Sequence, residues 1–514
     1  MKRCFAVLVC LGLVGHAWAQ EHDSFVNKDT ENMPNMAVSE DLSANSAFSA
    51  PSPRLRYVLQ GVKIEGNYKT RRSVILDYIT LERGDVVDVE DDSLEAIRYR
   101  LLGTGFFSSV RLSLKRGSKR GYVILLVTVT ERNTLRIDQV AAGIAEGVRR
   151  TADRTADIEP FFGVALSDRN FFGTGLMLSG ATALSPAQQG VRLGVLAPRV
   201  VAKEISLSGS IFFNNAREFF GGDDVRVSIA CPAGISPADC PEEVLAKNAV
   251  VRYKRAGLKF GSGQELSSRL YLTVDWQGEL VDVTAIPDAA SQKRGNDITP
   301  IDFAIDPDLS VVSMVELALT FDRRDNPVLP SKGLHFKIQS DHASRFIASD
   351  YDYFKLQVQA RYWFKLPWGH TLRLGAFGGA IFGRAPFFQK FYVADLNDLL
   401  PSRMLGLNFD RRRPPSILGT AAKEMRNEDL AGRVDVQYAW PVYRNPTGIR
   451  ATDLFFTTGL YYISSRRDLL VGLSGYNELS RIPVDLTFDF GLRMDTDIGV
   501  FQFAFSTMVG FLVL

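Results

Sequence analysis

Alternation of apolar and polar residues dominates the C-terminal part of the chain, and the stretch from Tyr353 to Lys365 shows it most clearly. The apolar register contains Phe354, Leu356, Val358, Ala360, Tyr362 and Phe364, and the other register contains Tyr353, Lys355, Gln357, Gln359, Arg361, Trp363 and Lys365. Side chains of a strand have a period of two, so this strand has one oily and one polar face. The apolar face could be buried by a second packed layer, as in a soluble protein, or by lipid, as around a membrane barrel.

The same two-faced pattern recurs from residue 134 to the end of the chain. The predicted strands are 134–147, 159–167, 175–185, 190–198, 203–214, 249–261, 266–283, 309–322, 333–342, 351–366, 370–383, 430–441, 452–463, 482–495 and 498–513. Long inserts at 215–248, 284–308 and 384–429 alternate with tight turns, as in an outer-membrane barrel. Closing the sheet into a barrel also removes the exposed edge strands that a long open sheet would have. An even strand number is expected when both ends lie on one side, so residues 133–514 are predicted to form an antiparallel transmembrane β-barrel of about 16 strands.

A compact α/β unit precedes this region, over residues 55–132. A strand at 57–65 is followed by a helix at 71–81, and a second helix begins after Asp91 and Asp92, which suit a helix N-terminus. Leu94, Ile97 and Leu101 follow helical spacing. Strands at 110–115 and 122–130 complete a β-α-α-β-β order.

The N-terminus predicts export. Lys2 and Arg3 precede an apolar run and the small-residue pattern Ala17-Trp18-Ala19, which is typical of a signal peptide over residues 1–19. Residues 20–54 are polar and are predicted to be a disordered periplasmic leader. Beyond the signal peptide, no stretch reaches the ~18 apolar residues of a membrane helix. Without Lys2 and Arg3, the 60 basic residues fall to the number of acidic residues, 58, so nucleic-acid binding has no electrostatic support.

Cysteines and histidines offer little chemistry. Cys231 and Cys240 survive signal removal, and an exported close pair most simply forms a loop disulfide, with metal binding as the alternative. The histidines after residue 19 are not at metal-ligand spacing, and no phosphate-binding loop or Gly-x-Ser-x-Gly motif occurs. We therefore expect no cofactor, no metal and no enzymatic activity, although distant strands could still assemble a catalytic triad.

Five motifs occur in an order that resembles the BamA/TamA superfamily of outer-membrane proteins. The α/β unit is similar to a POTRA domain, including Gly105-Phe106-Phe107, which follows its second helix. The further motifs are Glu131-Arg132-Asn133, Ser167–Gly175, Phe321–Gly333 and Asp495–Gly499. In the fourth motif, Asp322, Arg323, Asp325, Pro330 and Gly333 resemble a strand-turn element; Pro330 cannot continue a ladder and Gly333 frees the backbone to turn.

The resemblance also implies that the insert 384–429 folds back into the barrel lumen through an Arg-Gly pair. The nearest counterparts here are Arg403 and Gly406, which are separated by two residues. We expect Arg403 to pair with a lumen acid, Asp489 or Asp435. The alternative is that residues 401–415 form a basic external loop.

The family resemblance implies a function in assembling outer-membrane proteins or translocating proteins. Unfolded outer-membrane or secreted clients would add a strand to the edge formed by Val110, Leu112 and Leu114. They would then pass through, or be templated at, the seam of a barrel embedded in the outer-membrane lipid bilayer, with the N-terminal domain in the periplasm. Accessory lipoproteins are further expected partners. The alternative is a passive pore, or a secretion pore dedicated to one partner.

Overall fold

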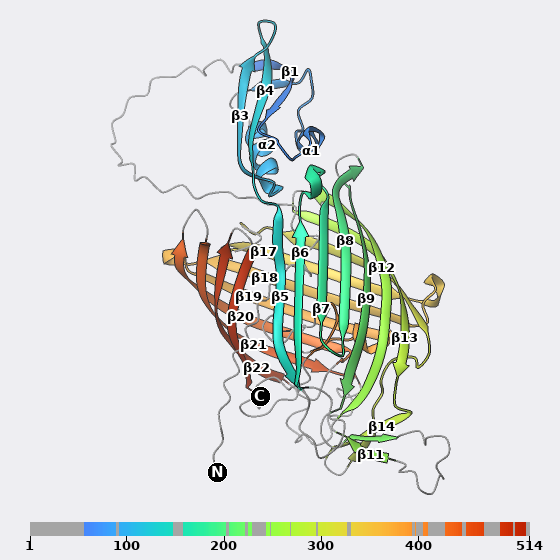
Figure 1. The fold of residues 1–514 in the computed structure, drawn as a ribbon. Coiled ribbons are helices and arrows are strands. Elements are labelled where there is room, and N and C mark those ends of the chain that lie inside the picture. Colours follow the sequence, from blue (N-terminus) through green and yellow to red (C-terminus); the bar gives the residue numbers. More distant parts are fainter. Residues whose placement is uncertain are drawn as a thin grey trace.

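The computed structural model describes residues 56–88, 92–146, 158–201, 205–221, 225–228, 243–246, 248–267, 269–294, 297–325, 330–392, 396, 404–409, 427–444, 449–466, 484–496 and 499–509. A small α/β domain lies at one end of a large curved sheet, and the loops with the small extra strands lie at the other end (Figure 1). The predicted signal peptide and leader lie outside the described residues.

The α/β domain contains one strand that the sequence did not predict. Its elements are β1 (Arg56–Glu65), α1 (Arg72–Asp77), β2 (Val86–Asp88), α2 (Asp92–Gly103), β3 (Phe107–Arg116) and β4 (Tyr122–Glu131). The sheet order is β2-β1-β4-β3, with β1 parallel to β4. The predicted β-α-α-β-β order is confirmed, and β2 is an additional strand that the sequence did not reveal because three residues are too few to show a period of two.

The two helices of this domain cover one face of the sheet. Ile75 from α1 and Ile97 and Leu101 from α2 are fully buried against Leu125 and Val127 of β4. Helix α1 ends at Asp77, before the predicted end at residue 81, but the following Tyr78 and Ile79 still reach the same core. The apolar residues that follow α1 therefore remain packed in the core although they lie in a turn.

The large sheet contains fifteen strands, each of which matches one predicted strand. They are β5 (Leu135–Glu146), β6 (Ile158–Asp168), β7 (Met177–Leu184), β8 (Gln189–Val201), β9 (Ile205–Phe220), β12 (Ala249–Ser267), β13 (Leu270–Ala285), β16 (Ser310–Asp322), β17 (Gly333–Ala343), β18 (Asp352–Lys365), β19 (Thr371–Arg384), β20 (Leu430–Arg444), β21 (Ile449–Ser464), β22 (Val484–Thr496) and β23 (Gly499–Val509). Neighbours in this order pair antiparallel. The described residues thus supply fifteen of the roughly sixteen strands expected.

The first and last strands of this sheet meet at a seam. Some Cα atoms of β5 and β23 lie within 8 Å of each other, which brings the sheet round into a barrel. Over the described residues these two strands share no hydrogen-bonded ladder, in contrast to all the other neighbouring strands of the barrel.

Two inserts that the sequence analysis treated as loops carry a second sheet, so that prediction was wrong. The strands are β10 (Val225–Ser228), β11 (Glu243–Ala246), β14 (Ala289–Arg294) and β15 (Asp297–Pro300), in the order β11-β10-β14-β15. Strands of four to six residues are too short to show alternation. Short 3₁₀ turns lie at Phe171–Gly173, Arg345–Ile347, Pro367–Gly369 and Phe387–Gln389.

The barrel strands are two-faced in the predicted sense. In β18, Tyr353 and Trp363 are 2% and 7% exposed on the inner face, whereas Phe354 and Phe364 are about 40% exposed on the outer face. In the part of the chain that the structure describes, no helix is long and apolar enough to cross a membrane.

Candidate functional site in the barrel lumen and at its rim

An ion pair inside the barrel joins β12 to β13. The Arg255 guanidinium lies 2.6 Å from the Glu279 carboxylate, and the side chain of Glu279 is fully buried. Because Arg255 is opposite Val281 in the ladder, Glu279 is its diagonal neighbour on the same face. Arg255 also lies 3.9 Å above the ring of Phe388, in the long insert after β19.

A row of acidic side chains crosses the next strands on the inner wall. Asp275 is opposite Glu316, and Glu316 is opposite Asp341. Lys259 lies 3.0 Å from Asp275 and 2.9 Å from Glu316, and Lys355 is opposite Asp341 at the other end of the row. Like charges on directly opposite residues repel, so the two lysines stabilise this row.

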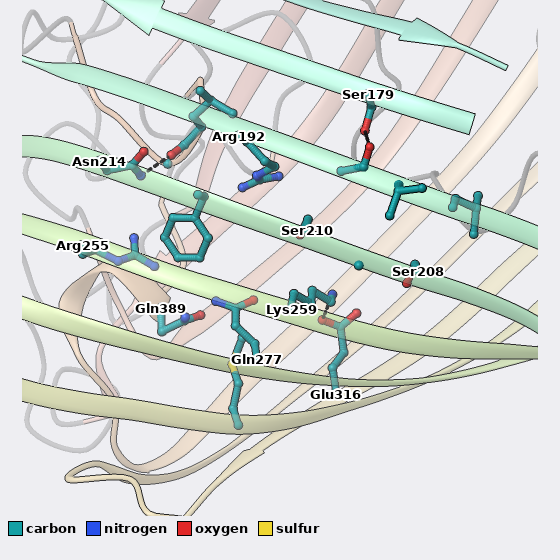
Figure 2. Close-up of a pocket in the computed structure, with 18 of the residues that line it drawn as sticks. Ser179, Arg192, Ser208, Ser210, Asn214, Arg255, Lys259, Gln277, Glu316 and Gln389 are labelled. Carbon is teal, nitrogen blue, oxygen red and sulfur yellow. Dashed lines mark hydrogen bonds and ion pairs between the residues drawn. The ribbon is translucent and has the colours of Figure 1, made fainter. Parts of the chain in front are cut away.

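Arg255, Lys259 and Glu316 border a lumen cavity of about 490 Å³. Figure 2 shows the ion pair of Lys259 and Glu316 beside this cavity, with Arg255, Gln277 and Gln389 nearby. Ser179 on β7 and Ser208 and Ser210 on β9 line the cavity from the same curved sheet. The lining is polar, as expected for a surface that water wets.

Part of the long insert after β19 lies inside the barrel, against strands β6, β8 and β9. Asn214 Nδ2 donates a 2.7 Å hydrogen bond to the Leu405 carbonyl, and Gln188 Nε2 donates one of 2.9 Å to the Asn408 carbonyl. The ring of Phe409 stacks on Phe161 at 5.2 Å. The described segment 404–409 therefore occupies the lumen near the end far from the α/β domain.

Of the predicted lumen residues, the structure describes Gly406, Asp435 and Asp489. Gly406 has a φ of +77° and lies beside the Arg255 and Asn214 side chains, where a Cβ would be 3.7 Å from the guanidinium. Arg403 lies outside the described residues, so its pairing stays a prediction. Asp435 already pairs with Arg373 at 2.6 Å and Arg433 at 2.9 Å, which the sequence analysis missed because it depends on the register of β19 and β20. The other predicted partner, Asp489, is buried in β22.

The strand-turn motif between β16 and β17 is held by its acidic residues. Asp322 pairs with Arg324 at 2.5 Å, and Asp325 accepts hydrogen bonds from the backbone N–H groups of Ser331 and Lys332 at 2.9 and 3.1 Å. Gly333 has a φ of +115°, and a Cβ there would lie 2.1 Å from the Arg323 carbonyl oxygen. Pro330 precedes this Gly turn. Glycine is required at residue 333 by both conformation and space.

The motif at residues 167–175 docks the α/β domain onto the barrel. Asn170 Nδ2 donates a 2.9 Å hydrogen bond to Thr70 Oγ1, and the Arg71 N–H donates one of 2.8 Å to the Gly173 carbonyl. A Cβ on Gly173, whose φ is +70°, would lie 1.8 Å from the Lys69 carbonyl oxygen. The sequence analysis identified this segment by resemblance, but it had no signal for the contact, which joins residues 100 positions apart.

Charged residues support this docking from both sides. Glu131 accepts hydrogen bonds from the backbone N–H groups of Thr70 and Lys69 at 2.6 and 2.8 Å. Partial burial raises the pKa of Glu131, but these bonds outweigh it and the net pKa is lowered. From the barrel, Arg199 lies 4.7 Å above the ring of Tyr78, and burial raises the pKa of the Tyr78 hydroxyl. Burial, with repulsion from Arg136, lowers the pKa of Arg169 to about 10.

The predicted client edge, β3, is an edge strand of the domain sheet. It pairs with β4 and, over the described residues, with no other strand. Val110 is buried in the domain core, and Leu112 and Leu114 pack partly against it, so the backbone, not these side chains, is accessible from the edge. Cys231 and Cys240 lie outside the described residues, and their disulfide stays a prediction.

Comparison with known proteins agrees with this architecture. Residues 170–398 match the Omp85 superfamily domain, and residues 57–132 match the POTRA model described as a surface antigen variable number repeat. The chain is 26% identical over 461 residues to the outer membrane protein assembly factor BamA of Nitratidesulfovibrio vulgaris, an alignment that covers 86% of this chain and 49% of that protein. It therefore spans about half the length of that relative.

Two solved structures share the fold. BamA from Haemophilus ducreyi lacking POTRA domains 1–3 has a TM-score of 0.51 at 14% identity and covers 89% of this chain and 82% of its own. CdiB from Escherichia coli has a TM-score of 0.52 at 10% identity, with coverages of 89% and 73%.

The fold and these matches define an outer-membrane β-barrel protein with a periplasmic POTRA domain in front of its barrel. The Omp85 superfamily domain over residues 170–398, the POTRA domain over residues 57–132 and the similarity to BamA confirm the resemblance to the BamA/TamA superfamily that the motifs indicated.

Proposed function

We propose that this protein assembles client proteins into the outer membrane or moves them across it. The observation that carries the proposal is the seam between β5 and β23. These strands approach each other, yet over the described residues they share no ladder, whereas adjacent barrel strands elsewhere are paired along their length. Unpaired backbone groups at the seam are a template for an added strand.

The POTRA domain is connected directly to this seam. Strand β4 ends at Glu131 and β5 begins at Leu135, and the Arg132 N–H donates a 3.0 Å hydrogen bond to the Phe106 carbonyl just before β3. In the proposal, an unfolded outer-membrane or secreted client adds a strand to the free edge of β3 and then moves to the seam. The docking at Asn170 and Gly173 keeps the two surfaces in a fixed relation.

The proposed process is not enzymatic. A client barrel buries apolar surface in the bilayer when it inserts, and this burial supplies the driving force without a nucleotide or metal. Accessory lipoproteins that present clients to the POTRA domain are proposed partners, on the family resemblance alone.

The alternative is a pore, either passive or dedicated to one secreted partner. The two functions are separated by depleting the protein and measuring the amounts of other outer-membrane barrels and the permeability to small solutes. A broad loss of barrels supports assembly; unchanged barrels with altered permeability contradict it.

A second experiment tests the seam itself. Cysteine pairs placed across β5 and β23 in a variant without the native cysteines would lock the seam when oxidised. We expect client insertion to stop on oxidation and resume on reduction. The matched control is an oxidised pair at Ile338 and Val358, which are opposite each other in the β17–β18 ladder. Insertion that continues with a locked seam would contradict the proposal.

A further inference from the structure

The free edge of the POTRA sheet carries charge of one sign. From Phe107 to Thr130, which covers β3, its turn and nearly all of β4, the basic residues number five and the acidic residues none. All five basic side chains are exposed: Arg111, Lys115, Arg116, Lys119 and Arg120. Glu65 of β1 is an acidic residue near Lys115, and it pairs with Lys63 at 2.9 Å. An extended segment that pairs with β3 therefore meets a cationic strip.

The turn that carries two of these cations has a fixed structure. The Ser118 N–H donates a 2.8 Å hydrogen bond to Gln60 Oε1, and Gln60 Nε2 donates one of 2.9 Å to Ser118 Oγ. The Gly117 N–H closes the hairpin on the Tyr122 carbonyl at 2.8 Å. The strip is thus held in place by the first strand of the domain, β1.

The chain itself contains a segment of opposite charge that leads into this region. The leader, residues 20–54, contains two basic residues, Lys28 and Arg54, and six acidic residues: Glu21, Asp23, Asp29, Glu31, Glu40 and Asp41. The leader joins β1, where the Val58 N–H donates a 2.9 Å hydrogen bond to the Gly121 carbonyl of the cationic turn.

The distances allow the leader to reach the edge. Strand β3 is two positions from β1 in the sheet, roughly 10 Å at ordinary strand spacing. Glu40 and Asp41 precede Arg56 by about 15 residues, which span up to ~50 Å when extended, more than the roughly 33 Å length of β3.

We propose that the leader, residues 20–54, docks on the free edge of β3 and its turn, with its backbone along the edge strand and its carboxylates toward the five cations. The covalent link gives the leader an effective concentration on the order of millimolar at the edge, so it occupies the edge ahead of free peptides of similar affinity. A client protein that binds the edge of β3 must then displace the leader. The docking itself does not depend on the proposed function, because it concerns only this chain.

The test uses the full-length protein in detergent micelles with a photo-crosslinking residue at Ser113, an exposed position in the middle of β3. We expect crosslinks to peptides from residues 20–54 at low salt. Replacing the six leader acids by amides should reduce them at least fivefold, as should neutralising the edge with Arg111→Gln, Lys115→Gln and Arg116→Gln, or adding 0.5 M salt. The control is Arg83→Gln, which removes an exposed cation elsewhere in the domain and should leave the crosslinks unchanged.

Hydrogen exchange gives an independent measurement. Edge amides of residues 107–116 should exchange about tenfold more slowly in the wild type than in the leader-amide variant, because docking protects them. Leader crosslinks that are absent, or that persist after neutralisation, would overturn the proposal, and so would equal exchange rates. An added acidic peptide that crosslinks to Ser113 while the leader does not would also overturn it, and would show that the edge binds a partner in trans. Barrel levels after depletion report separately on the proposed function.

Discussion

Substitution of Gly173 by alanine should release the POTRA domain from the barrel. The new Cβ would lie 1.8 Å from the Lys69 carbonyl oxygen, and two backbone segments cannot share that space. The docked state would lose the hydrogen bonds from Arg71 to Gly173 and from Asn170 to Thr70, each worth about 1 kcal/mol. Loss of the Arg199 contact with Tyr78 adds about 0.5–1 kcal/mol. A total of about 2.5–3 kcal/mol lowers the ratio of docked to released molecules about 60- to 140-fold.

The control for backbone strain is Gly84→Ala in the same domain. Gly84 also has a positive φ, +104°, but a Cβ there would meet no atom within 4 Å. Both substitutions therefore incur the cost of about 1–2 kcal/mol for a left-handed alanine, and only one of them obstructs docking.

The assay is the distribution of distances between spin labels at Arg83 in the POTRA domain and at Leu266 near the C-terminal end of β12, in a variant without native cysteines. The wild type and Gly84→Ala should give one narrow distribution, and Gly173→Ala a broad one with the domain still folded. A narrow distribution for Gly173→Ala would refute the reasoning, because it would show that the turn yields without undocking.

Three further substitutions test the lumen, the lipid face and the junction. Arg255→Met should lower the free energy of unfolding by about 3–5 kcal/mol, measured by thermal unfolding, because it leaves the buried Glu279 carboxylate without its partner. The double variant Arg255→Met, Glu279→Met should recover most of this loss. Equal destabilisation of the single and the double variant would contradict the reasoning. Val358→Lys on the outer face should cost about 2–4 kcal/mol if the residue lies near mid-membrane, and Gln357→Lys in the cavity lining far less, measured by urea unfolding in bilayers. The pKa of Glu131 is lowered below its ordinary value of 4.5. Its contribution of about 1 kcal/mol to docking is therefore complete above pH 4.5 and is lost as the pH falls through the lowered pKa. The spin-label distances of Glu131→Gln should not show this pH dependence.

The period of two was enough to locate the barrel strands because it is a local signal. Each strand shows its own inner and outer face, and β18 has Tyr353 and Trp363 inside as the alternation indicated. The strands that were missed, β2 and the four of the second sheet, are too short for alternation to appear.

Contacts between distant residues were beyond sequence reasoning. The bridge from Lys259 to Asp275 and Glu316 requires knowing that β12, β13 and β16 are neighbours, and with what stagger. The same holds for Asn170 and Thr70 at the junction. Family resemblance marked the segment 167–175, but only the structure shows that Gly173 is there because a carbonyl oxygen approaches it.

The parity of the barrel has a geometric consequence for the seam. Over the described residues the barrel sheet has fifteen strands with antiparallel neighbours, so its first and last strands, β5 and β23, run in the same direction. Direct pairing between them would need the slanted hydrogen bonds of a parallel ladder, unlike the rest of the barrel. A strand that runs antiparallel to β5 is also antiparallel to β23. One extended segment between them can therefore continue the barrel's own hydrogen-bond pattern on both of its sides and bring the number of strands to sixteen.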